Sequence, residues 1–262
     1  MDFLTLIGLG IGASAVYYVM KTSGIQELLY NMQAFVLVFG GTFASTIMTY
    51  PWAILKRVPR ATLLIFFPPK TKSPKETIEE IVHLSEIVKR AGIDSLEMEY
   101  DRITDRFLLD GLKMIVNGLS PDLIRENLEK EIAFTRIRHQ QIANVFRSGG
   151  TYAPVFGLLG TLIGVVQILK NLTDPKSLGA AMAIAVTTTF YGIFGANFVF
   201  LPLAGKLTAH SDAEILLKEV IIEGILALQS KEVPAIVELK LQAYLAQQFR
   251  ETAGSPEQQP IV

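Results

Sequence analysis

Hydroxyl side chains are the groups best placed for chemistry in this sequence, because they interrupt two apolar segments that carry no charge. Thr161 lies in the segment from about 150 to 169, and Thr187–Thr189 form a run in the segment from about 178 to 204. Hydroxyl oxygens can ligate an ion or hold water, so we interpret Thr161, Thr188 and Thr189 as candidate ion-path residues. The alternative is that each threonine bonds a carbonyl in its own preceding helical turn.

Small residues accompany these hydroxyls on one face of each segment. They are Ala153, Gly157, Gly160 and Gly164 in the first segment, and Gly179, Ala183 and Thr187 with Ala185 and Gly192 beside them in the second. Small side chains let helix backbones approach closely in lipid, so we expect both faces to lie between helices.

Four segments are apolar and long enough to cross a bilayer as helices, which takes about 20 residues each. They run from about 4 to 20, 32 to 55, 150 to 169 and 178 to 204, and none contains Asp, Glu, Lys, Arg or His. Four such segments favour a membrane protein over a soluble protein with buried helices. A cleaved signal peptide is the alternative for the first segment, but Asp2 stands where its positive charge is expected.

Cations that follow the second span predict the topology and the domain organisation. They are Lys56, Arg57, Arg60, Lys70, Lys72 and Lys75. The positive-inside rule places this region and both termini in the cytoplasm. We therefore predict an all-α membrane protein with four transmembrane helices and a helical cytoplasmic domain. Its parts are a hairpin (1–55), the cytoplasmic domain (56–147), a second hairpin (148–205) and C-terminal helices with a tail (206–262).

Capping signals predict the helices of the cytoplasmic part. Ser73-Pro74 with Glu76 forms a capping box for a helix that runs to about Arg90. Further helices are expected from 94 to 116, from Pro121 through 147 into the third span, beyond the fourth span, and from Pro234 onward. Apolar residues at helical spacing, such as Ile124, Leu128 and Ile132, predict that these helices pack together. Residues 254–262 are expected to be disordered.

Several kinds of chemistry have no residues to support them. The chain has no cysteine and only three histidines, none of them in a metal-ligand motif, so neither a metal nor a cofactor is expected. A membrane enzyme would need a nucleophile with a base, or a metal cluster, near membrane depth, and no His, Cys, Asp or Glu lies there, so no enzyme is expected. The net charge of −1 gives no reason to expect a nucleic-acid partner. Ion or proton transport through a dry membrane usually needs a titratable group along the path. Because the spans supply none, either no ion moves or a partner helix brings the acid.

Two prolines border the spans. Pro154 is expected near the start of a helix, where its missing N–H does no harm. Pro202 lies near the cytoplasmic end of the fourth span, where it should kink the helix and free a carbonyl. A hinge between the membrane and cytoplasmic parts is the functional interpretation of that kink.

Several separated motifs resemble those of the MotA/PomA family of flagellar stator proteins. They are LVFGGTFAST (37–46), KRAGIDSLE (89–97), YAPVFGLLGTLIG (152–164), DPKSLGAAMAIAVTTTFYG (174–192), ANFVFLPLAGKL (196–207) and IIEGILALQ (221–229). Together they cover the chain in the family's order. The chain departs from the family's usual Gly-Glu-Asn-Pro at Ser230–Pro234.

The resemblance implies a function and a set of partners. It implies a stator subunit of the bacterial inner membrane, five copies of which surround two copies of a MotB/PomB-like partner that carries the essential aspartate. A transported proton or sodium ion would turn the ring against the rotor protein FliG. The resemblance favours sodium as the transported ion, because both threonine positions carry hydroxyls, as they do in the sodium-type members. The alternative is an energiser of the ExbB/TolQ type, or another ion-driven machine that is not a flagellum.

The same resemblance implies roles for individual residues. Thr161 and Thr189 match hydroxyls that face the partner's aspartate, and Pro154 and Pro202 match prolines tied to ion-driven conformational change. Four charged residues match rotor-contacting positions: Lys89, Arg90, Glu97 and the weaker neighbour Glu99. The alternative for these charges is an ordinary solvated helix surface.

Overall fold

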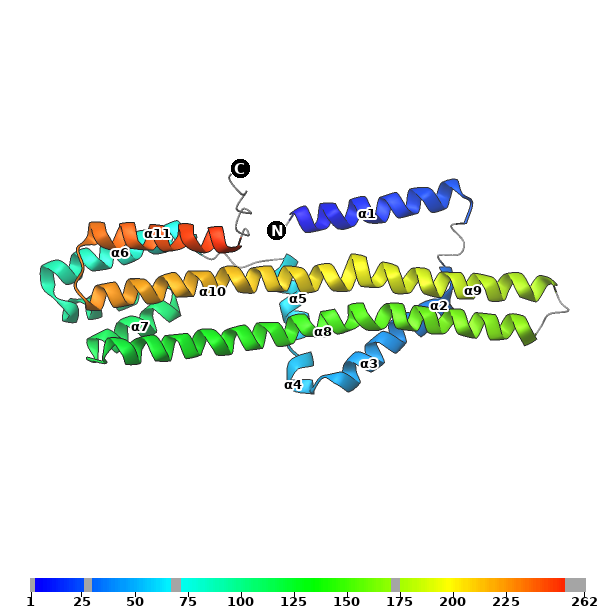
Figure 1. Cartoon of the computed structure of the whole chain (residues 1–262), viewed down its shortest axis with the longest axis horizontal. Coiled ribbons are helices and arrows are strands. Elements are labelled where there is room, and N and C mark those ends of the chain that lie inside the picture. Colours follow the sequence, from blue (N-terminus) through cyan, green and yellow to red (C-terminus); the bar gives the residue numbers. More distant parts are fainter. Residues whose placement is uncertain (1–2, 26–29, 67–71, 171–174, 253–262) are drawn as a thin grey trace, which may run out of the picture. The chain divides into compact units, whose positions relative to one another are not determined.

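The computed structural model describes residues 3–25, 30–66, 72–170 and 175–252. Within these ranges the chain is helical and has no strand, so the predicted all-α class is confirmed (Figure 1). The chain divides into two compact units: unit 1 contains residues 1–69 and 138–209, and unit 2 contains residues 70–137 and 210–262. Two long helices, α8 (Pro121–Lys170) and α10 (Leu201–Gln229), contribute residues to both units.

Unit 1 holds the apolar helices. Besides its parts of α8 and α10, it consists of α1 (Phe3–Thr22), α2 (Met32–Phe35), the π-helical η2 (Val36–Gly40), α3 (Gly41–Thr49), α4 (Trp52–Leu55), α5 (Val58–Phe66), α9 (Pro175–Phe194) and the π-helical η4 (Gly195–Phe200). In the described part of the chain, three helical stretches are long and apolar enough to cross a membrane, within 32–49, 121–170 and 178–229. They contain most or all of the second, third and fourth predicted spans. The first predicted span lies on α1, a helix of 20 residues.

The second span is shorter than predicted. We expected one helix from about 32 to 55, but α3 ends at Thr49 and Tyr50 is extended, with φ −116° and ψ 138°. Pro51 accounts for the break, because the ring of a proline disfavours the helical conformation for the residue before it. The chain therefore turns at Tyr50-Pro51, and the short helices α4 and α5 follow in a new direction.

Helices α8 and α9 lie against each other through a seam of glycines. A Cβ atom at Gly157 would lie 2.9 Å from the carbonyl oxygen of Thr188, and one at Gly164 would lie 2.8 Å from the carbonyl oxygen of Ala181. At Gly192 of α9 it would lie 2.6 Å from the carbonyl oxygen of Ala153. Because no side chain fits at these contacts, the two backbones touch.

The contact face of α9 agrees only in part with the one predicted. It includes Ala181, Ala185, Thr188 and Gly192. Ala185 and Gly192 belong to the predicted face, whereas Ala181 and Thr188 do not. The predicted row at four-residue steps was Gly179, Ala183 and Thr187. A Cβ atom at Gly179 meets nothing within 4 Å. The row at strict four-residue steps drifts around the helix, and the actual contacts follow a mixture of three- and four-residue steps.

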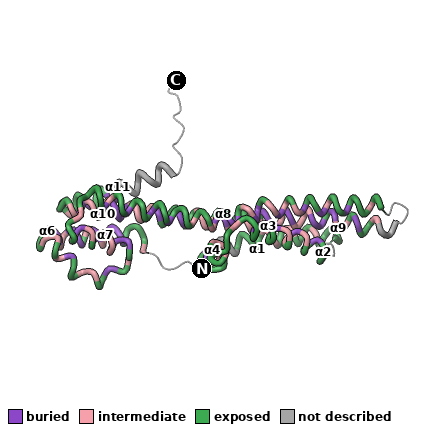
Figure 2. Tube along the Cα trace, turned by 90° about the horizontal axis from the view of Figure 1, so that it is seen from below, coloured by how far each residue is buried: buried purple, intermediate pink, exposed green. Residues whose placement is uncertain are grey.

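Unit 2 packs around one apolar core, as predicted. It combines α6 (Pro74–Ala91), the 3-10 helix η3 (Ile93–Arg102), α7 (Arg106–Val116) and α11 (Pro234–Thr252) with parts of α8 and α10. Ile124 and Leu128 of α8 are fully buried in this core, together with Ile221 and Ile225 of α10. Figure 2 shows the buried face of these helices.

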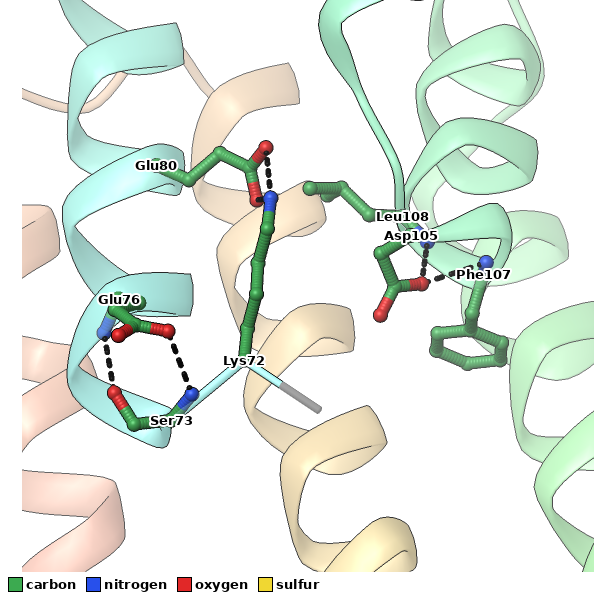
Figure 3. A network of polar contacts seen from close by, with 7 residues as sticks. All are labelled: Lys72, Ser73, Glu76, Glu80, Asp105, Phe107 and Leu108. Carbon is green, nitrogen blue, oxygen red and sulfur yellow. Dashed lines mark hydrogen bonds and ion pairs between the residues drawn. The ribbon is translucent and has the colours of Figure 1, made fainter. Parts of the chain in front are cut away.

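The first helix of unit 2 begins and ends as its sequence predicts. The hydroxyl oxygen of Ser73 accepts a hydrogen bond from the N–H of Glu76 at 3.2 Å, and the Glu76 carboxylate accepts one from the N–H of Ser73 at 2.9 Å (Figure 3). This capping box satisfies two backbone donors at the helix start. Gly92 ends the helix with φ 86°, a conformation that other residues rarely adopt.

The single helix predicted from 94 to 116 is wrong, because the chain forms η3 and then α7. Asp105 caps α7: one carboxylate oxygen accepts from the N–H groups of Phe107 at 2.8 Å and Leu108 at 3.1 Å (Figure 3). An aspartate that satisfies two N–H groups in this way starts a new helix. The expected disorder of residues 254–262 concerns residues that the structure does not describe.

Leu128 and Leu123 provide a matched test of the unit 2 core, because both lie on α8. Leu128 is fully buried, whereas Leu123 is 50% exposed. We expect Leu128→Ala to lower the free energy of unfolding by about 2–5 kcal/mol, because it leaves a cavity. Leu123→Ala should change it by less than about 1 kcal/mol. The free energy of unfolding of each variant is measured from its loss of helicity in denaturant, with the chain solubilised in detergent. Equal destabilisation by the two substitutions would contradict the assigned core.

Gly192 and Gly179 test the glycine seam in the same way, because both lie on α9. Gly192→Ala inserts a methyl group against the backbone of α8, so we expect destabilisation of about 1–3 kcal/mol. Gly179→Ala meets open space and should gain the ordinary helix preference of alanine, up to about 1 kcal/mol. Thermal unfolding of the two variants in detergent measures the difference. A Gly192→Ala protein as stable as the Gly179→Ala protein would mean that the helices do not touch there.

Candidate functional site

Two of the predicted ion-path hydroxyls meet across the seam between α8 and α9. The hydroxyl oxygens of Thr161 and Thr189 lie 3.1 Å apart, and both side chains are half-buried. The Thr161 hydroxyl lies 3.1 Å from the carbonyl oxygen of Gly157, and the Thr189 hydroxyl lies 3.5 Å from the same oxygen. Gly157 thus brings a third oxygen to the pair, because its missing side chain lets the helices close.

The chemistry of this site is that of neutral oxygens. Each hydroxyl has one proton and two acceptor lone pairs, so Thr161 and Thr189 cannot fill all their lone pairs through each other and the backbone. The lone pairs that remain can accept from water or ligate a hard cation, which prefers oxygen ligands. Among the described residues, no group of three or more His, Cys, Asp or Glu could hold a metal ion.

Thr188 lies in a different environment from its two neighbours at the site. Its side chain is completely buried, and its hydroxyl donates to the carbonyl oxygens of Ile184 at 3.0 Å or Ala185 at 2.9 Å in its own helix. It fills the space left by Gly160 on α8. These contacts make Thr188 part of the packing between the helices, and its place on an ion path stays a prediction.

Pro154 lies inside a continuous helix. We expected it near a helix start, but α8 runs without interruption from Pro121 to Lys170 and includes the Gly149-Gly150 pair. Both glycines are buried against side chains from the start of α10 and the end of η4, which holds the helix together there. Because proline has no N–H, the carbonyl of Gly150 loses its helical partner. That carbonyl lies about one turn before the glycine seam begins.

Pro202 follows a π-helical turn. The segment η4 ends at Phe200, and α10 then begins at Leu201. A proline ring collides with the carbonyl four residues earlier in an α-helix, and the wider π-turn relieves that collision. This turn also lies against the other π-helical segment, since a Cβ atom at Gly195 would be 3.2 Å from the ring of Phe39 in η2. Neither π-helical segment was predicted from the sequence.

Four hydroxyl groups join the end of α3 to α8, and the sequence reasoning missed them. The Thr49 hydroxyl lies 2.9 Å from the Tyr152 hydroxyl. The Tyr50 hydroxyl donates to the carbonyl oxygen of Asn144 at 2.9 Å and lies 2.8 Å from the Ser148 hydroxyl. Polar residues just before Pro51, at the end of an apolar run, were the available signal.

The predicted rotor-contacting charges lie on both sides of the turn at Gly92. Lys89 and Arg90 end α6, Glu97 lies on η3, and all three are exposed. Arg90 contacts Glu86 one turn earlier at 3.4 Å, through a side chain that is 80% exposed. These three side chains remain accessible to another protein.

Glu99 differs from these exposed charges. Its side chain is 15% exposed and pairs with Arg102 at 3.0 Å. The neighbouring Tyr100 has its pKa raised, first by burial and then by the negative charge of Glu97. A carboxylate that is already paired and covered is a poorer contact for another protein than Glu97 is.

Comparison with known proteins gives a consistent result. Residues 99–220 match the MotA/TolQ/ExbB proton channel family. The chain is 34% identical to "Chemotaxis protein PomA" of Vibrio alginolyticus, over 94% of this chain and 96% of that protein. It is 32% identical to "Motility protein A" of Bacillus subtilis, over 94% of this chain and 91% of that protein.

The fold also matches solved structures. The structure of the flagellar MotAB stator complex from Bacillus subtilis contains a chain with 30% sequence identity and a TM-score of 0.86, covering 97% of this chain and 99% of that one. The similarity therefore extends over both units and includes the helices that carry Thr161 and Thr189. The chain belongs to the MotA/TolQ/ExbB proton channel family, in its branch of MotA and PomA motility proteins.

Proposed function

We propose that this chain is the MotA-like subunit of a flagellar stator, which couples the flow of an ion to torque on the rotor. The observation that carries the proposal is the pair of hydroxyls at Thr161 and Thr189, which meet at a glycine seam between two apolar segments, 150–169 and 178–204, that contain no Asp, Glu, Lys, Arg or His. An ion that reaches this pair meets neutral oxygens only. The membrane-capable helices and the family membership support the same function.

A partner supplies the acid that this chain lacks. Ionisable residues inside a membrane typically mark the path of a proton or ion, so a MotB/PomB-like helix with an aspartate would lie beside Thr161 and Thr189. The exposed face of α8 supports this, because Val155, Leu158, Leu162 and Val166 are all more than half exposed. Five copies around a partner dimer would cover such faces, and the solved structure that the fold matches is a MotAB stator complex.

The chain would cross the inner membrane four times, with both termini in the cytoplasm. Helix α1 serves as the first span in this arrangement, and α2–α3, α8 and α9 with η4 as the others. Three exposed cations just after the second span, Lys56, Arg57 and Arg60, set the orientation. Unit 2 would then face the rotor.

The transported ion is sodium or the proton, and the site favours sodium. Thr161, Thr189 and the Gly157 carbonyl bring three neutral oxygens together, and neutral oxygens ligate a metal cation without a proton exchange. Pro154 and Pro202 would act in coupling, because each removes a helical hydrogen bond between the ion site and the cytoplasmic ends of the spans.

The proposed function is tested by swimming in a host that lacks its own stators and expresses this chain with its cognate MotB-like partner. We expect motility that requires both proteins and that fails without sodium. Motility that is independent of sodium would assign the proton. A stable membrane complex that never drives a flagellum would overturn the proposal in favour of an ExbB/TolQ-like energiser.

Thr189 is tested by replacing its hydroxyl. Thr189→Ala should abolish or strongly reduce motility, because it removes one of three oxygens at the site, whereas Thr189→Ser keeps the oxygen and should retain most of the swimming speed. Speed as a function of sodium concentration separates ion binding from assembly, since a weakened site needs more sodium. Unchanged motility in the alanine variant would remove Thr189 from the ion path.

Arg90 and Glu97 are tested by charge reversal. Arg90→Glu and Glu97→Lys should each cut torque, measured by the rotation of a bead on a flagellar stub, while the complex with the MotB-like partner stays intact. Lys130→Glu is the matched control, because Lys130 is an exposed cation elsewhere on unit 2. Loss of the partner complex in the Arg90 or Glu97 variants would instead assign these residues a structural role.

A further inference from the structure

A stretch of the chain around α4 and α5 contains cations and no acid. Between Glu27 and Glu76 the sequence has no Asp or Glu at all. The described cations at its far end are neutralised in unit 2, because Lys72 pairs with Glu80 at 2.8 Å and Lys75 lies 3.8 Å from Glu79. The other cations of the stretch that the structure describes lie just after α4.

These cations are Lys56, Arg57 and Arg60. All three are exposed, and none forms an ion pair or a side-chain hydrogen bond with any residue that the structure describes. Most cations of unit 2 do pair, including Arg102, Arg125 and Lys218. Three neighbouring cations without a partner point to an anion outside the chain.

The helix that carries Arg60 runs across the membrane-capable helices instead of along them. The chain turns at Tyr50-Pro51, and α5 then crosses the direction of α8 within unit 1 (Figure 1). If the apolar part of α8 spans the bilayer, α5 lies close to the plane of its surface. Ala61 and Ile65 form its inner face, 7% and 0% exposed.

The outer face of this region is apolar next to the cations. Leu63 is 60% exposed and Leu64 is 46% exposed, three and four residues beyond Arg60 and so on the same side of α5. Trp52 is 75% exposed and lies one turn before Lys56. Tryptophan, exposed leucines and long cationic side chains together are typical of a helix in the membrane interface.

We propose that residues 52–65 bind the anionic phospholipids of the leaflet that they face. Lys56, Arg57 and Arg60 contact the phosphate groups, and Trp52, Leu63 and Leu64 enter the boundary of the acyl chains. Clusters of cations just beyond a membrane span attract anionic lipid in this way, and their aliphatic stems remain in the apolar layer. An acidic protein surface would also suit the three cations, but it would leave Trp52 and the two leucines without an apolar partner.

The one tryptophan of the chain reports on this site directly. The full chain is reconstituted in vesicles of phosphatidylcholine mixed with phosphatidylglycerol, with brominated acyl chains on one lipid or on the other. We expect brominated phosphatidylglycerol to quench the fluorescence of Trp52 to an extent that corresponds to an enrichment of this lipid around Trp52, relative to the bulk bilayer, of about fivefold or more. The preference should shrink in about 1 M salt, where the screening length falls to about 3 Å.

Two triple variants complete the test. The first variant combines Lys56→Gln, Arg57→Gln and Arg60→Gln, and it should abolish the preference for phosphatidylglycerol. The second combines Lys75→Gln, Arg106→Gln and Lys130→Gln. It removes the same charge from unit 2 and should leave the preference unchanged. The proposal would be overturned if the native chain showed no lipid preference, if the preference survived in the first variant, or if both variants lost it equally. The salt dependence of the native chain decides the matter if the first variant fails to fold. None of these measurements depends on ion transport.

Discussion

Backbone contact between α8 and α9 determines where the polar groups of unit 1 can lie. The two helices approach until the carbonyl of Ala153 occupies the space of a side chain at Gly192. At that separation the hydroxyls of Thr161 and Thr189 have to meet, since each lies beside the seam on its own helix. A larger residue at Gly157 would both separate the helices and bury the carbonyl that completes the site. Gly157 therefore acts on the site both through its carbonyl oxygen and through the short distance between the helices that its missing side chain allows.

The same packing explains why neighbouring threonines differ. Thr188 points into the seam, is completely buried and satisfies its hydroxyl within α9. Thr189 is rotated by one residue, about 100°, and keeps part of its surface open. Burial keeps an ion away from the lone pairs of the Thr188 hydroxyl, whereas the Thr189 hydroxyl lies at a partly open surface where its lone pairs can accept one. Within the run of threonines, the position of each residue around the helix therefore decides whether its side chain packs between helices or is open to an ion.

The sequence was sufficient for the features that depend on local signals. The helix start at Ser73, its end at Gly92 and the buried stripe through Ile124 and Leu128 were all predicted, because each follows from a few neighbouring residues. Thr161 and Thr189, whose hydroxyls meet, were also singled out from the sequence because small residues accompany them, and their place on an ion path stays a prediction. The break at Asp105 was missed because the capping signal lay inside a strongly helical pattern.

Other features depend on tertiary contact and could not be predicted. Pro154 is accommodated within α8 because side chains of η4 and α10 cover Gly149-Gly150 and hold the helix straight through its weakest turns. The contact row of α9 is fixed by the shape of α8 and not by the spacing within α9 itself. Both outcomes require knowledge of the neighbouring helix, which periodicity does not contain.

Pairing among the surface charges separates the cations that stabilise unit 2 from those that remain available. Exposed ion pairs such as Arg90–Glu86 contribute about 0–1 kcal/mol, so a stronger external contact can replace them at little cost. Glu99 is covered and paired, and releasing it would also expose its neighbours. Binding to another protein should therefore use Arg90 and Glu97 before Glu99. Lys56, Arg57 and Arg60 have no pairs to break, which suits a permanent contact with lipid better than one made and released in each step of a motor.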